Sequence, residues 1–401
     1  MKILQINAVY GQGSTGTIVR DIEHLCEQSG IECYVASPDK RVVEAKRGYV
    51  IGNTIDHKLH ALLSRINGKQ AYFSHLTTRR LLKYIDGIQP DIVHLHNLHS
   101  NYIHLNMLLN DLAKKDIKTI VTLHDCWFYT GGCFHYTAAG CKKWLKRCGN
   151  CPKKKQDTPA LLFDCSARIL ADRKTHLLAI PHLVVTGVSD WIANEAHRTF
   201  LKDLNIIVIH NGVDMDIFKP TASNMRRELG LEGKYVILGP ASKWLLPINK
   251  IILDKFTKLM QPDEVLLLFG VWQTAGMLPQ NVITFGYTKD RNELAALYTC
   301  ADVFANVSRE DSLSLINVES QACGTPVVTF DQTGPKETVD DVNSFNTPVG
   351  DAEELYETVQ KVRKLRTPNI SQKCRKFVEV QYDMHKKYQL YIDLYKRTVV
   401  R

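Results

Sequence analysis

The sequence predicts an α/β protein of two domains, each a parallel β-sheet covered by helices. Short apolar runs alternate with helical patterns along the chain, which is the order that parallel βα units produce. A turn-rich segment, residues 210–220, divides these runs into two series. The 401 residues suffice to bury a separate core in each of two domains. We therefore expect two Rossmann-like domains joined at this segment.

The apolar runs on either side of the turn-rich segment are expected to be strands. Those before it are Lys2–Ala8, Cys33–Ala36, Ile92–Leu95, Thr119–Leu123, His182–Gly187 and Ile206–Ile209. Those after it are Tyr235–Gly239, Val265–Phe269, Val282–Phe285, Val303–Ala305 and Val327–Phe330. We expect the domains to span residues 1–212 and 213–382, with a C-terminal helix in residues 383–401.

Composition excludes several classes of protein. No apolar run approaches the roughly 18–20 residues that a membrane span needs, and the first ten residues suit a buried strand better than a signal peptide. The net charge of +9 comes without a nucleic-acid-binding motif, so no nucleic-acid partner is expected. Eleven cysteines suit a reducing cytoplasm, where they remain thiols or bind metal. We therefore expect a cytoplasmic protein.

Residues 309–330 carry the most informative functional pattern. An acidic loop with Asp311 leads into a short helix that carries Glu319, and Gly324 ends this helix before an apolar strand. The unpaired N–H groups at the helix start, near Leu313, Ser314 and Leu315, can bind an anion such as a diphosphate. Each carboxylate could then bind a pair of sugar hydroxyls. An ordinary loop–helix–strand unit with solvated acids is the alternative.

This stretch resembles the acid-x7-acid donor site of retaining, nucleotide-sugar-dependent glycosyltransferases of the GT-B fold, in their group 1 (family four) class. The block Ala-Cys-Gly-Thr-Pro-Val-Val at 322–328 is typical of that class, and so is Asn-Gly-Val-Asp at 211–214. The class usually has Glu where this chain has Asp311. The resemblance implies two Rossmann-like domains that face each other across a cleft, with the terminal helix, Met384–Lys396, crossing back to the N-terminal domain.

The resemblance also implies roles for the residues of the donor domain. Glu319 would hold the ribose hydroxyls and Asp311 the hydroxyls of the transferred sugar. Lys243 stands where the class has an arginine that neutralises the diphosphate, and it lacks the forked geometry of arginine. The Lys-Gly pair of the class is replaced by Ile-Asn at 248–249, so Lys250 is the nearest remaining cation. We therefore expect an altered diphosphate clamp and no catalytic metal or cofactor.

A glycine loop follows the first expected strand. Gly11, Gly13 and Gly16 fit the Gly-x-Gly-x-x-Gly dinucleotide fingerprint, which makes an NAD-dependent oxidoreductase the rival prediction. That reading needs an acid at the end of the second strand, where Asp39 arrives only after a proline. In the glycosyltransferase class the same loop, here with Gly13, Ser14 and Gly16, approaches the donor phosphates or the acceptor.

Two histidine motifs end successive strands, at the edge where open α/β sheets bind ligands. His94, His96 and Asn97 end the first, and His124 and Asp125 end the second. The class has a donor-contacting histidine at the position of His124, and Asp125 could orient its ring. We assign His96 and Asn97 to the acceptor and His94 to the structure; core packing is the alternative for each histidine.

Four cysteines in the segment after His124 form a candidate zinc site. Cys148-x-x-Cys151 is a zinc-knuckle half-site, and Cys133 with Cys141 would complete a tetrahedral set of four sulfurs. Glycosyltransferases of the colanic-acid type have a similar insert. A zinc ion there would be structural, because four thiolates leave no open position. Free thiols in a surface loop are the alternative.

The same segment is strongly basic. Seven cations occur in residues 142–155 without an acid, and Trp144 and Leu145 lie among them; the cations are Lys142, Lys143, Lys146, Arg147, Lys153, Lys154 and Lys155. This mixture suits an anionic membrane surface, although a solvated loop would look the same. It allows a peripheral position on the inner face of the cell membrane.

The combined prediction is a retaining glycosyltransferase. It would move a sugar from a UDP- or GDP-sugar to a polysaccharide or polyprenyl-linked acceptor. A GT-B nucleotide-sugar epimerase and a non-catalytic nucleotide-sugar-binding protein are the alternatives.

Overall fold

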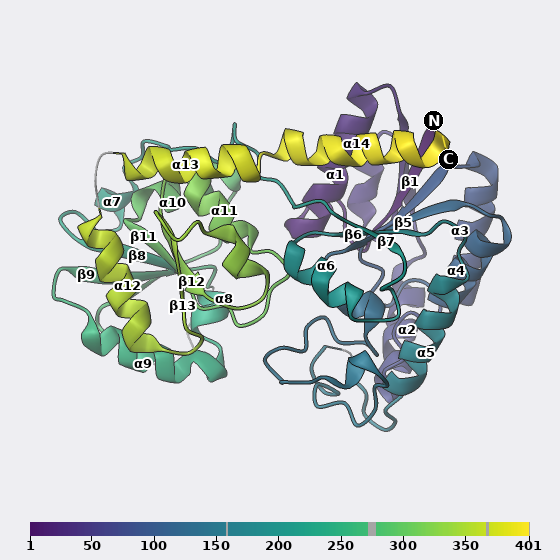
Figure 1. The fold of residues 1–401 in the computed structure, drawn as a ribbon, viewed down its shortest axis with the longest axis horizontal. Coiled ribbons are helices and arrows are strands. Elements are labelled where there is room, and N and C mark those ends of the chain that lie inside the picture. Colours follow the sequence, from purple (N-terminus) through teal and green to yellow (C-terminus); the bar gives the residue numbers. More distant parts are fainter. Residues whose placement is uncertain (158, 272–277, 366–368, 401) are drawn as a thin grey trace. The chain divides into compact units, whose positions relative to one another are not determined.

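The computed structural model describes residues 1–157, 159–271, 278–365 and 369–400. The chain divides into two compact units (Figure 1). Unit 1 comprises Met1–His210 together with the C-terminal residues from Lys387 on, and unit 2 comprises Asn211–Lys386. The chain therefore leaves unit 1 at the turn-rich segment and returns to it at its end.

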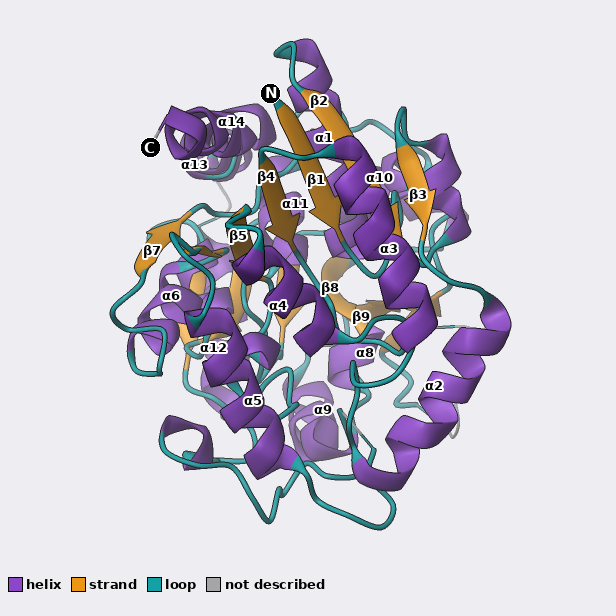
Figure 2. Cartoon of the chain, turned by 90° about the vertical axis from the view of Figure 1, so that its right-hand side faces the viewer, coloured by secondary structure: helices purple, strands orange, loops and turns teal. Residues whose placement is uncertain are grey.

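Unit 1 contains a seven-stranded parallel sheet of order β3-β2-β1-β4-β5-β6-β7. In Figure 2 the orange strands β4, β1, β2 and β3 follow one another across the sheet. The strands are β1 (Lys2–Ile6), β2 (Glu32–Ser37), β3 (Gly48–Val50), β4 (Ile92–Leu95), β5 (Lys118–Leu123), β6 (Val184–Gly187) and β7 (Asn205–Val208). All six predicted strands are confirmed, and β3, a three-residue edge strand, was not predicted.

Helices follow most of these strands along the chain. They are α1 (Gly13–Gln28), α2 (Thr54–Asn67), α3 (His75–Ile88), α4 (Leu105–Lys114), α5 (Ser166–Leu178) and α6 (Asp190–His197). Short 3₁₀ turns are η1 (Lys40–Glu44), η2 (Trp127–Tyr129) and η3 (Lys143–Leu145). Between β5 and α5 the chain is mostly irregular, and this segment contains the four cysteines of the candidate zinc site.

The last helix, α14 (Met384–Val400), packs on the sheet of unit 1. Tyr391 and Tyr395 are fully buried. The hydroxyl of Tyr395 lies 2.6 Å from Nδ1 of His94, and the hydroxyl of Tyr391 lies 3.2 Å from Oγ1 of Thr122. The prediction that the C-terminal helix returns to the N-terminal domain is confirmed, and its tyrosine stripe makes the contact.

Unit 2 contains a six-stranded parallel sheet of order β10-β9-β8-β11-β12-β13. The strands are β8 (Tyr235–Pro240), β9 (Glu264–Phe269), β10 (Val282–Phe285), β11 (Val303–Asn306), β12 (Val327–Phe330) and β13 (Phe345–Thr347). The helices are α7 (Met225–Glu228), α8 (Ala241–Trp244), α9 (Lys250–Leu259), α10 (Arg291–Cys300), α11 (Leu315–Ala322), α12 (Ala352–Lys364) and α13 (Ile370–Gln381), with 3₁₀ turns η4 (Pro247–Asn249) and η5 (Gly334–Thr338).

Each sheet has one point where the strand order reverses: between β1 and β4 in unit 1, and between β8 and β11 in unit 2. Open parallel sheets bind ligands outside the carboxyl ends of the strands at such switch points. The predicted fold of two Rossmann-like domains is confirmed, and each domain offers one such position. Among the described residues, no helix is both long and apolar enough to span a bilayer.

Candidate functional site

In unit 2, the loop after β11 leads into α11 and leaves the start of this helix open. Ser314 occupies the N-cap position, but its side chain makes no hydrogen bond to the helix N–H groups. The hydroxyl of Ser314 instead accepts a hydrogen bond from Nδ2 of Asn306, at 2.9 Å. No acidic side chain lies in the first turn. The N–H groups and the positive end of the helix dipole are therefore available to an anion.

A second loop, after β12, holds the acidic loop in place. The N–H of Gly334 donates to the carbonyl of Asp311 at 3.1 Å, and the N–H of Asp311 donates to Oγ1 of Thr333 at 3.3 Å. A Cβ atom on Gly334 would lie 1.8 Å from the carbonyl oxygen of Ser312. Only glycine permits this crossing. Thr333 has φ 56° and ψ −151°, a sparsely populated region typical of strained functional loops.

Glu319 lies on α11, at the other end of the acidic motif. Its carboxylate accepts a hydrogen bond from the hydroxyl of Tyr298 at 3.0 Å. Burial raises the pKa of Glu319, while the hydrogen bond from Tyr298 opposes this rise. The side chain of Glu319 is therefore held in one position, as a carboxylate that selects hydroxyl partners must be. The helix predicted for Glu319 is present, and Asp311 lies in the loop before it.

The cations expected for the diphosphate clamp have different surroundings. Lys243 is half-buried in α8, directly after β8. Lys250 begins α9, is exposed, and forms a surface ion pair with Asp254 at 2.7 Å. Of these two lysines, Lys243 is the one that lies beside the switch point in a partly buried setting.

Asn249 occupies one of the two positions where the class has the Lys-Gly pair, and its side chain connects neighbouring segments by hydrogen bonds. It is fully buried, and its Nδ2 donates to the carbonyls of Lys243 and Val307, both at 3.0 Å. Its Oδ1 accepts a hydrogen bond from Nε of Arg309 at 2.8 Å. Asn249 thus connects the backbone that carries Lys243 to the side chain of Arg309. The sequence reasoning overlooked Arg309, which directly precedes the acidic loop.

In unit 1, the predicted glycine loop opens α1. Gly11 and Gly13 have positive φ values of 67° and 63°, and the N–H of Gly11 donates to the carbonyl of Gly16 at 2.9 Å. Gly13 and Ser14 are exposed, and α1 has neither a side-chain cap nor an acid in its first turn. The loop can therefore approach an anionic ligand.

The geometry at Asp39 does not support the rival dehydrogenase. Its carboxylate pairs with the guanidinium of Arg41 and accepts the N–H of Tyr10 at 3.3 Å. It also caps the 3₁₀ turn η1. A carboxylate with these partners is not poised to bind a ribose 2′-hydroxyl.

Three polar side chains form a buried chain of hydrogen bonds across the switch point of unit 1. Nε2 of His124 lies 3.0 Å from Nδ1 of His96, and Nε2 of His96 lies 3.1 Å from Oε1 of Gln5. Nε2 of Gln5 donates to the carbonyl of Val19 at 3.1 Å, which fixes the orientation of the amide. We refer to Gln5, His96 and His124 as the histidine relay.

The direction of each hydrogen bond in the histidine relay follows from the amide of Gln5. Its oxygen can only accept, so His96 carries its proton on Nε2 and accepts at Nδ1. His124 must then carry its proton on Nε2, which leaves Nδ1 as an acceptor. Nδ1 of His124 is buried and has no partner among the described residues. Burial lowers the pKa of His124 to about 4 and that of His96 well below its usual range, so both rings are neutral.

The partner that orients His124 is therefore not Asp125, as expected, but His96. Asp125 pairs instead with Nε2 of His99 at 3.2 Å and accepts the N–H of Trp127 at 2.8 Å. His96 is fully buried with both ring nitrogens bonded, which does not fit a direct contact with an acceptor. His94 is buried between Tyr395 and Thr122, in the structural position expected for it.

The four cysteines predicted to bind zinc line one small cavity of about 20 Å³. Burial raises the pKa values of the Cys148 and Cys151 thiols, and the backbone N–H groups of Gly131 and Lys153 beside their sulfurs oppose this rise. None of the four cysteines is in a disulfide. Among the described residues, no three of their sulfur atoms lie within 4.8 Å of one another. The four cysteines therefore lie together, but their sulfur atoms are farther apart than in a tetrahedral zinc site, where the distance between sulfurs is about 3.8 Å.

The structure corrects one expectation for the basic segment. Trp144 is buried, stacks on Tyr136 with ring centroids 4.3 Å apart, and donates from Nε1 to the carbonyl of Cys141. It cannot act as a membrane anchor. Lys153 is also buried and pairs with Asp157 at 3.1 Å. Lys142, Lys143, Lys146, Arg147 and Lys155 are exposed.

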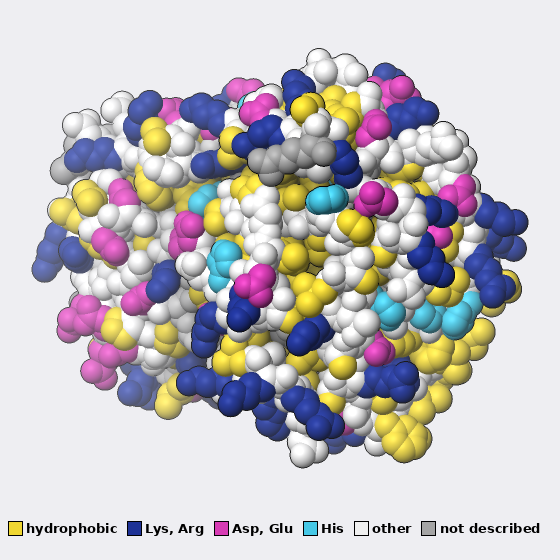
Figure 3. Space-filling view, turned by 45° about the vertical axis from the view of Figure 1, so that its right-hand side comes forward, with side chains coloured by type: hydrophobic (Ala, Val, Ile, Leu, Met, Phe, Trp, Pro, Cys, Tyr) yellow, Lys and Arg dark blue, Asp and Glu magenta, His cyan; other side chains and the backbone are white. Residues whose placement is uncertain are grey.

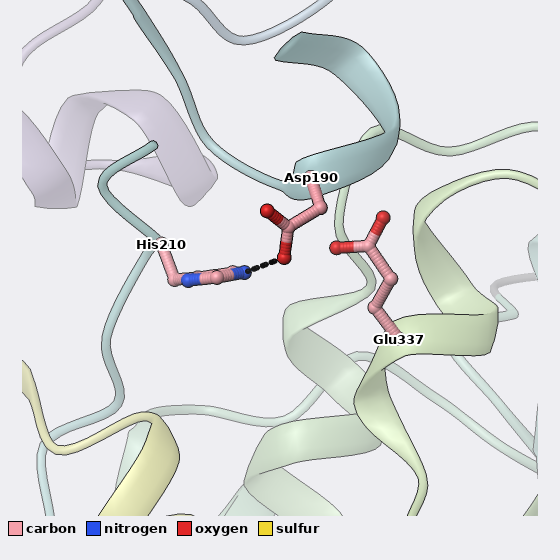
Figure 4. Close-up of side chains that lie close together, drawn as sticks. All are labelled: Asp190, His210 and Glu337. Carbon is pink, nitrogen blue, oxygen red and sulfur yellow. Dashed lines mark ion pairs between the residues drawn. The ribbon is translucent and has the colours of Figure 1, made fainter. Parts of the chain in front are cut away.

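A further titratable pair in unit 1 lies outside the histidine relay. Nε2 of His210 faces the carboxylate of Asp190 at 3.5 Å (Figure 4). The side chain of Asp190 is 65% exposed. Ion pairs this exposed contribute at most about 1 kcal/mol to stability. We assign this pair no role in the candidate site.

The chain is similar to known families and solved structures. Residues 15–153 match the family described as Glycosyltransferase Family 4, and residues 250–364 match Glycosyl transferases group 1. WcaC of Escherichia coli K12, named for colanic acid biosynthesis, is 24% identical over a 347-residue alignment, and the match covers 82% of each chain. A D-inositol 3-phosphate glycosyltransferase of Mycobacterium sp. (strain KMS) is 33% identical over 139 residues, 31% of each chain.

Two solved structures share the fold along nearly the whole chain. Sucrose-phosphate synthase from Thermosynechococcus elongatus has a TM-score of 0.72 at 16% identity and covers 99% of this chain and 98% of its own. Anabaena HepE, solved with UDP-glucose, has a TM-score of 0.67 at 16% identity and covers 99% of this chain and 100% of its own. At these identities, the likeness establishes the GT-B fold alone.

Proposed function

The chain belongs to the group 1 glycosyltransferases of the GT-B fold, and on this premise we propose that it is a retaining enzyme of polysaccharide biosynthesis. It would transfer a sugar from a nucleoside diphosphate to a polysaccharide or lipid-linked acceptor. One observation supports the donor class above all others. The uncapped start of α11 lies between two acids, Asp311 before it and Glu319 within it.

In this proposal, the diphosphate binds at the start of α11. Its charge would be balanced by the helix N–H groups, by Lys243, and by Arg309, which Asn249 connects to the Lys243 segment. Arg309 offers the planar guanidinium that Lys243 lacks. Preorganised donors of this kind stabilise the charge that builds on the leaving group. Lys250, which pairs with Asp254 at the surface, is assigned a weaker part than the sequence indicated.

The carboxylates of Glu319 and Asp311 would recognise different parts of the donor. Glu319, held by Tyr298, would accept hydrogen bonds from the ribose hydroxyls, and Asp311 from hydroxyls of the transferred sugar. His124 would accept a hydrogen bond at Nδ1 from a hydroxyl of the same sugar. The Gly13–Gly16 loop and Asn97 would approach the phosphates or the acceptor.

The proposed reaction needs no covalent enzyme intermediate. The bond between the anomeric carbon and the phosphate oxygen breaks while the acceptor oxygen bonds to the same face of that carbon. The departing phosphate oxygen takes the proton of the acceptor hydroxyl, so charge and atoms balance. The donor base follows the relatives: HepE binds UDP-glucose, and we propose a UDP- or GDP-sugar for this chain. WcaC supports a polysaccharide acceptor.

Two substitutions test these roles. Glu319→Ala and His124→Ala should each lower turnover with the cognate donor at least about tenfold, or about 1.4 kcal/mol in barrier. Glu357→Ala and His197→Ala, at exposed positions, are the matched controls and should keep wild-type rates. Wild-type turnover in both site variants would refute the roles. Formation of an isomerised nucleotide sugar in the absence of an acceptor would indicate an epimerase. Binding of a nucleotide sugar without turnover would indicate a non-catalytic protein. The comparisons support neither alternative.

We also propose a structural zinc ion in the cavity lined by Cys133, Cys141, Cys148 and Cys151. The cavity volume and the N–H groups beside two of the sulfurs support this assignment. Binding would draw the loops together, because the sulfurs are farther apart than tetrahedral ligands. Purified protein should contain one equivalent of zinc, and Cys148→Ser with Cys151→Ser should lose it. Metal-free protein with unchanged thermal stability after zinc addition would contradict the proposal.

A further inference from the structure

A cavity of about 350 Å³ lies at the edge of the unit 1 sheet that faces away from the histidine relay. Its wall includes Lys118, Val184 and Asn205, which are the first residues of β5, β6 and β7. Because these strands are parallel, their amino ends share one edge of the sheet, and His124 follows the opposite end of β5. The six residues of β5 separate the two edges by about 20 Å. A ligand in this cavity would therefore not occupy the candidate site.

Helix α14 forms a further wall of the cavity. Leu394, Arg397 and Thr398 line it, and they share one face of the helix because three or four positions separate them. Tyr391 and Tyr395, on the same helix, form the hydrogen bonds to Thr122 and His94 described above, which fix α14 on the sheet. The cavity is therefore enclosed by elements that the fold holds in place.

The interior of the cavity is apolar. The side chains that line it are aliphatic at six positions: Ile180, Leu183, Val184, Leu204, Ile207 and Leu394. Three of them, Ile180, Leu183 and Leu394, are each 4% exposed, so they lie below the surface of the unit. Sites for small molecules have volumes of about 300–1,000 Å³ and mostly apolar walls. This cavity therefore has the size and lining to hold the hydrocarbon or aromatic body of a small molecule.

Lys118 contributes a cation whose position is fixed. Its Nζ donates to the carbonyls of Thr398 and Val399, in the last turn of α14, at 2.7 and 2.8 Å. An ammonium group has three N–H donors. Within the described part of the chain, these two carbonyls are its hydrogen-bond acceptors, so one N–H is left for a ligand.

Arg397 contributes a second cation. Its Nε donates to the carbonyl of Asp393 at 3.3 Å, and its terminal nitrogens form no hydrogen bond or ion pair with a described residue. The other titratable side chains that line the cavity are His182 and Asp203, both exposed. Two cations thus accompany one carboxylate, which favours an anionic ligand over a cationic one.

Surface charge by itself does not mark this site. Figure 3 shows lysine and arginine side chains widely scattered over the face of the molecule that it draws. The cavity differs from such a surface because its two cations adjoin a buried aliphatic interior.

We propose that this cavity binds a small organic acid, a molecule with an apolar body and one anionic group. The body would pack against the aliphatic interior, and the anionic group would bind Lys118 and Arg397. A nucleotide sugar is a poor occupant, because its many hydroxyls would lose their water without gaining hydrogen-bond partners among aliphatic side chains. The inference stands on this cavity alone and does not depend on the proposed reaction.

Fluorescence titration of the full chain with 8-anilinonaphthalene-1-sulfonate tests the proposal, because this probe joins an aromatic body to one sulfonate. Wild-type protein should bind the probe saturably at one site, and decanoate should displace it, whereas decanol should not. N-phenyl-1-naphthylamine has the same rings without the sulfonate and should bind at least about fivefold more weakly.

Variants of the lining locate the bound probe. Leu204→Trp fills the cavity and should weaken binding at least about tenfold, whereas the control Leu76→Trp, at a 68% exposed position on α3, should bind like wild type. Arg397→Gln should weaken binding at least about threefold, and the control Arg79→Gln, exposed on α3, should not. Asp203→Asn should bind at least as tightly as wild type, because it removes a negative charge.

Four results would overturn the proposal. They are the absence of saturable binding to wild-type protein, wild-type affinity in Leu204→Trp, equal affinity for the probes with and without the sulfonate, and weaker binding in Asp203→Asn with no loss in Arg397→Gln. The last result would assign the cavity to a cation. Arg397→Gln and Asp203→Asn change exposed side chains and should retain the wild-type melting temperature, so they decide the matter even where Leu204→Trp does not fold.

Discussion

At the scale of single residues, Gln5 determines the tautomer of His124, although the two side chains are not in contact. Its amide orientation sets the tautomer of His96, and His96 sets that of His124. The result is a neutral His124 with an acceptor at Nδ1, suited to a sugar hydroxyl. Gln5 and His96 are thus positioning residues for His124.

Substitution of Gln5 tests the histidine relay. Gln5→Leu removes the acceptor for His96, so both rings should sample the other tautomer, which is visible in the ¹⁵N NMR spectrum of the histidines. Loss of one such hydrogen bond, about 0.5–1.5 kcal/mol, corresponds to roughly a two- to tenfold fall in kcat/KM. Gln5→Glu keeps an acceptor and should preserve the Nε2–H tautomer of His124. An unchanged tautomer in Gln5→Leu would show that Gln5 has no such part.

The buried histidines also predict how stability depends on pH. Burial lowers the pKa of His60, His104 and His124 to about 4, below the value near 6.5 of an unfolded chain. The unfolded state therefore binds more protons between pH 6.5 and 4, so stability falls as pH drops through this window. Urea unfolding at pH 5.5 should give a smaller free energy than at pH 7.5, by about 1 kcal/mol per histidine. A flat profile would contradict the assigned burial.

At the scale of elements, the site depends on two loops that cross at a glycine. A methyl group on Gly334 would overlap the carbonyl of Ser312, which belongs to the loop that carries Asp311. Gly334→Ala should therefore displace this loop, lower stability by about 1–3 kcal/mol and abolish donor binding. The control is Gly87→Ala, in α3, where a Cβ meets no atom within 4 Å. Donor affinity of Gly334→Ala equal to that of wild type would contradict the crossing.

Much of the element order follows from local patterns. All eleven predicted strands exist, with ends displaced by two residues at most. The strands that were missed, β3 and β13, have three residues each, too few to show a period. The acid-x7-acid motif could be recognised in the sequence because it lies within one loop and the helix that follows it.

Contacts between segments that are distant in the chain could not be predicted from the sequence. Asn249 connects Arg309 to the Lys243 segment by hydrogen bonds, which no local pattern in the sequence indicates. The position of Asn249 in the sequence had suggested only that a cation of the class was missing. His96 orients His124 only because their strands are neighbours in the sheet. Ile55, Leu59, Leu62 and Ile66 of α2 have an ordinary amphipathic spacing, and their exposure depends on which face of the helix packs on unit 1.

At the scale of the whole molecule, both units use the same arrangement. Each has a parallel sheet whose strand order reverses once, and each gathers its polar residues at that point. In unit 1 these are the glycine loop and the histidine relay. In unit 2 they are Lys243, Arg309 and the two acids around α11. One family match lies in unit 1 and the other in unit 2, so the likeness to glycosyltransferases extends to both units.

Calorimetric titration with a panel of UDP-, GDP- and ADP-sugars tests the central claim, that Asp311 and Glu319 bind an activated sugar at α11. At least one donor should bind wild-type protein with saturable heat. Its Kd should rise at least about tenfold, or about 1.4 kcal/mol, in Glu319→Ala and stay unchanged in Glu357→Ala. No heat with any donor, or equal affinity in Glu319→Ala, would contradict the account.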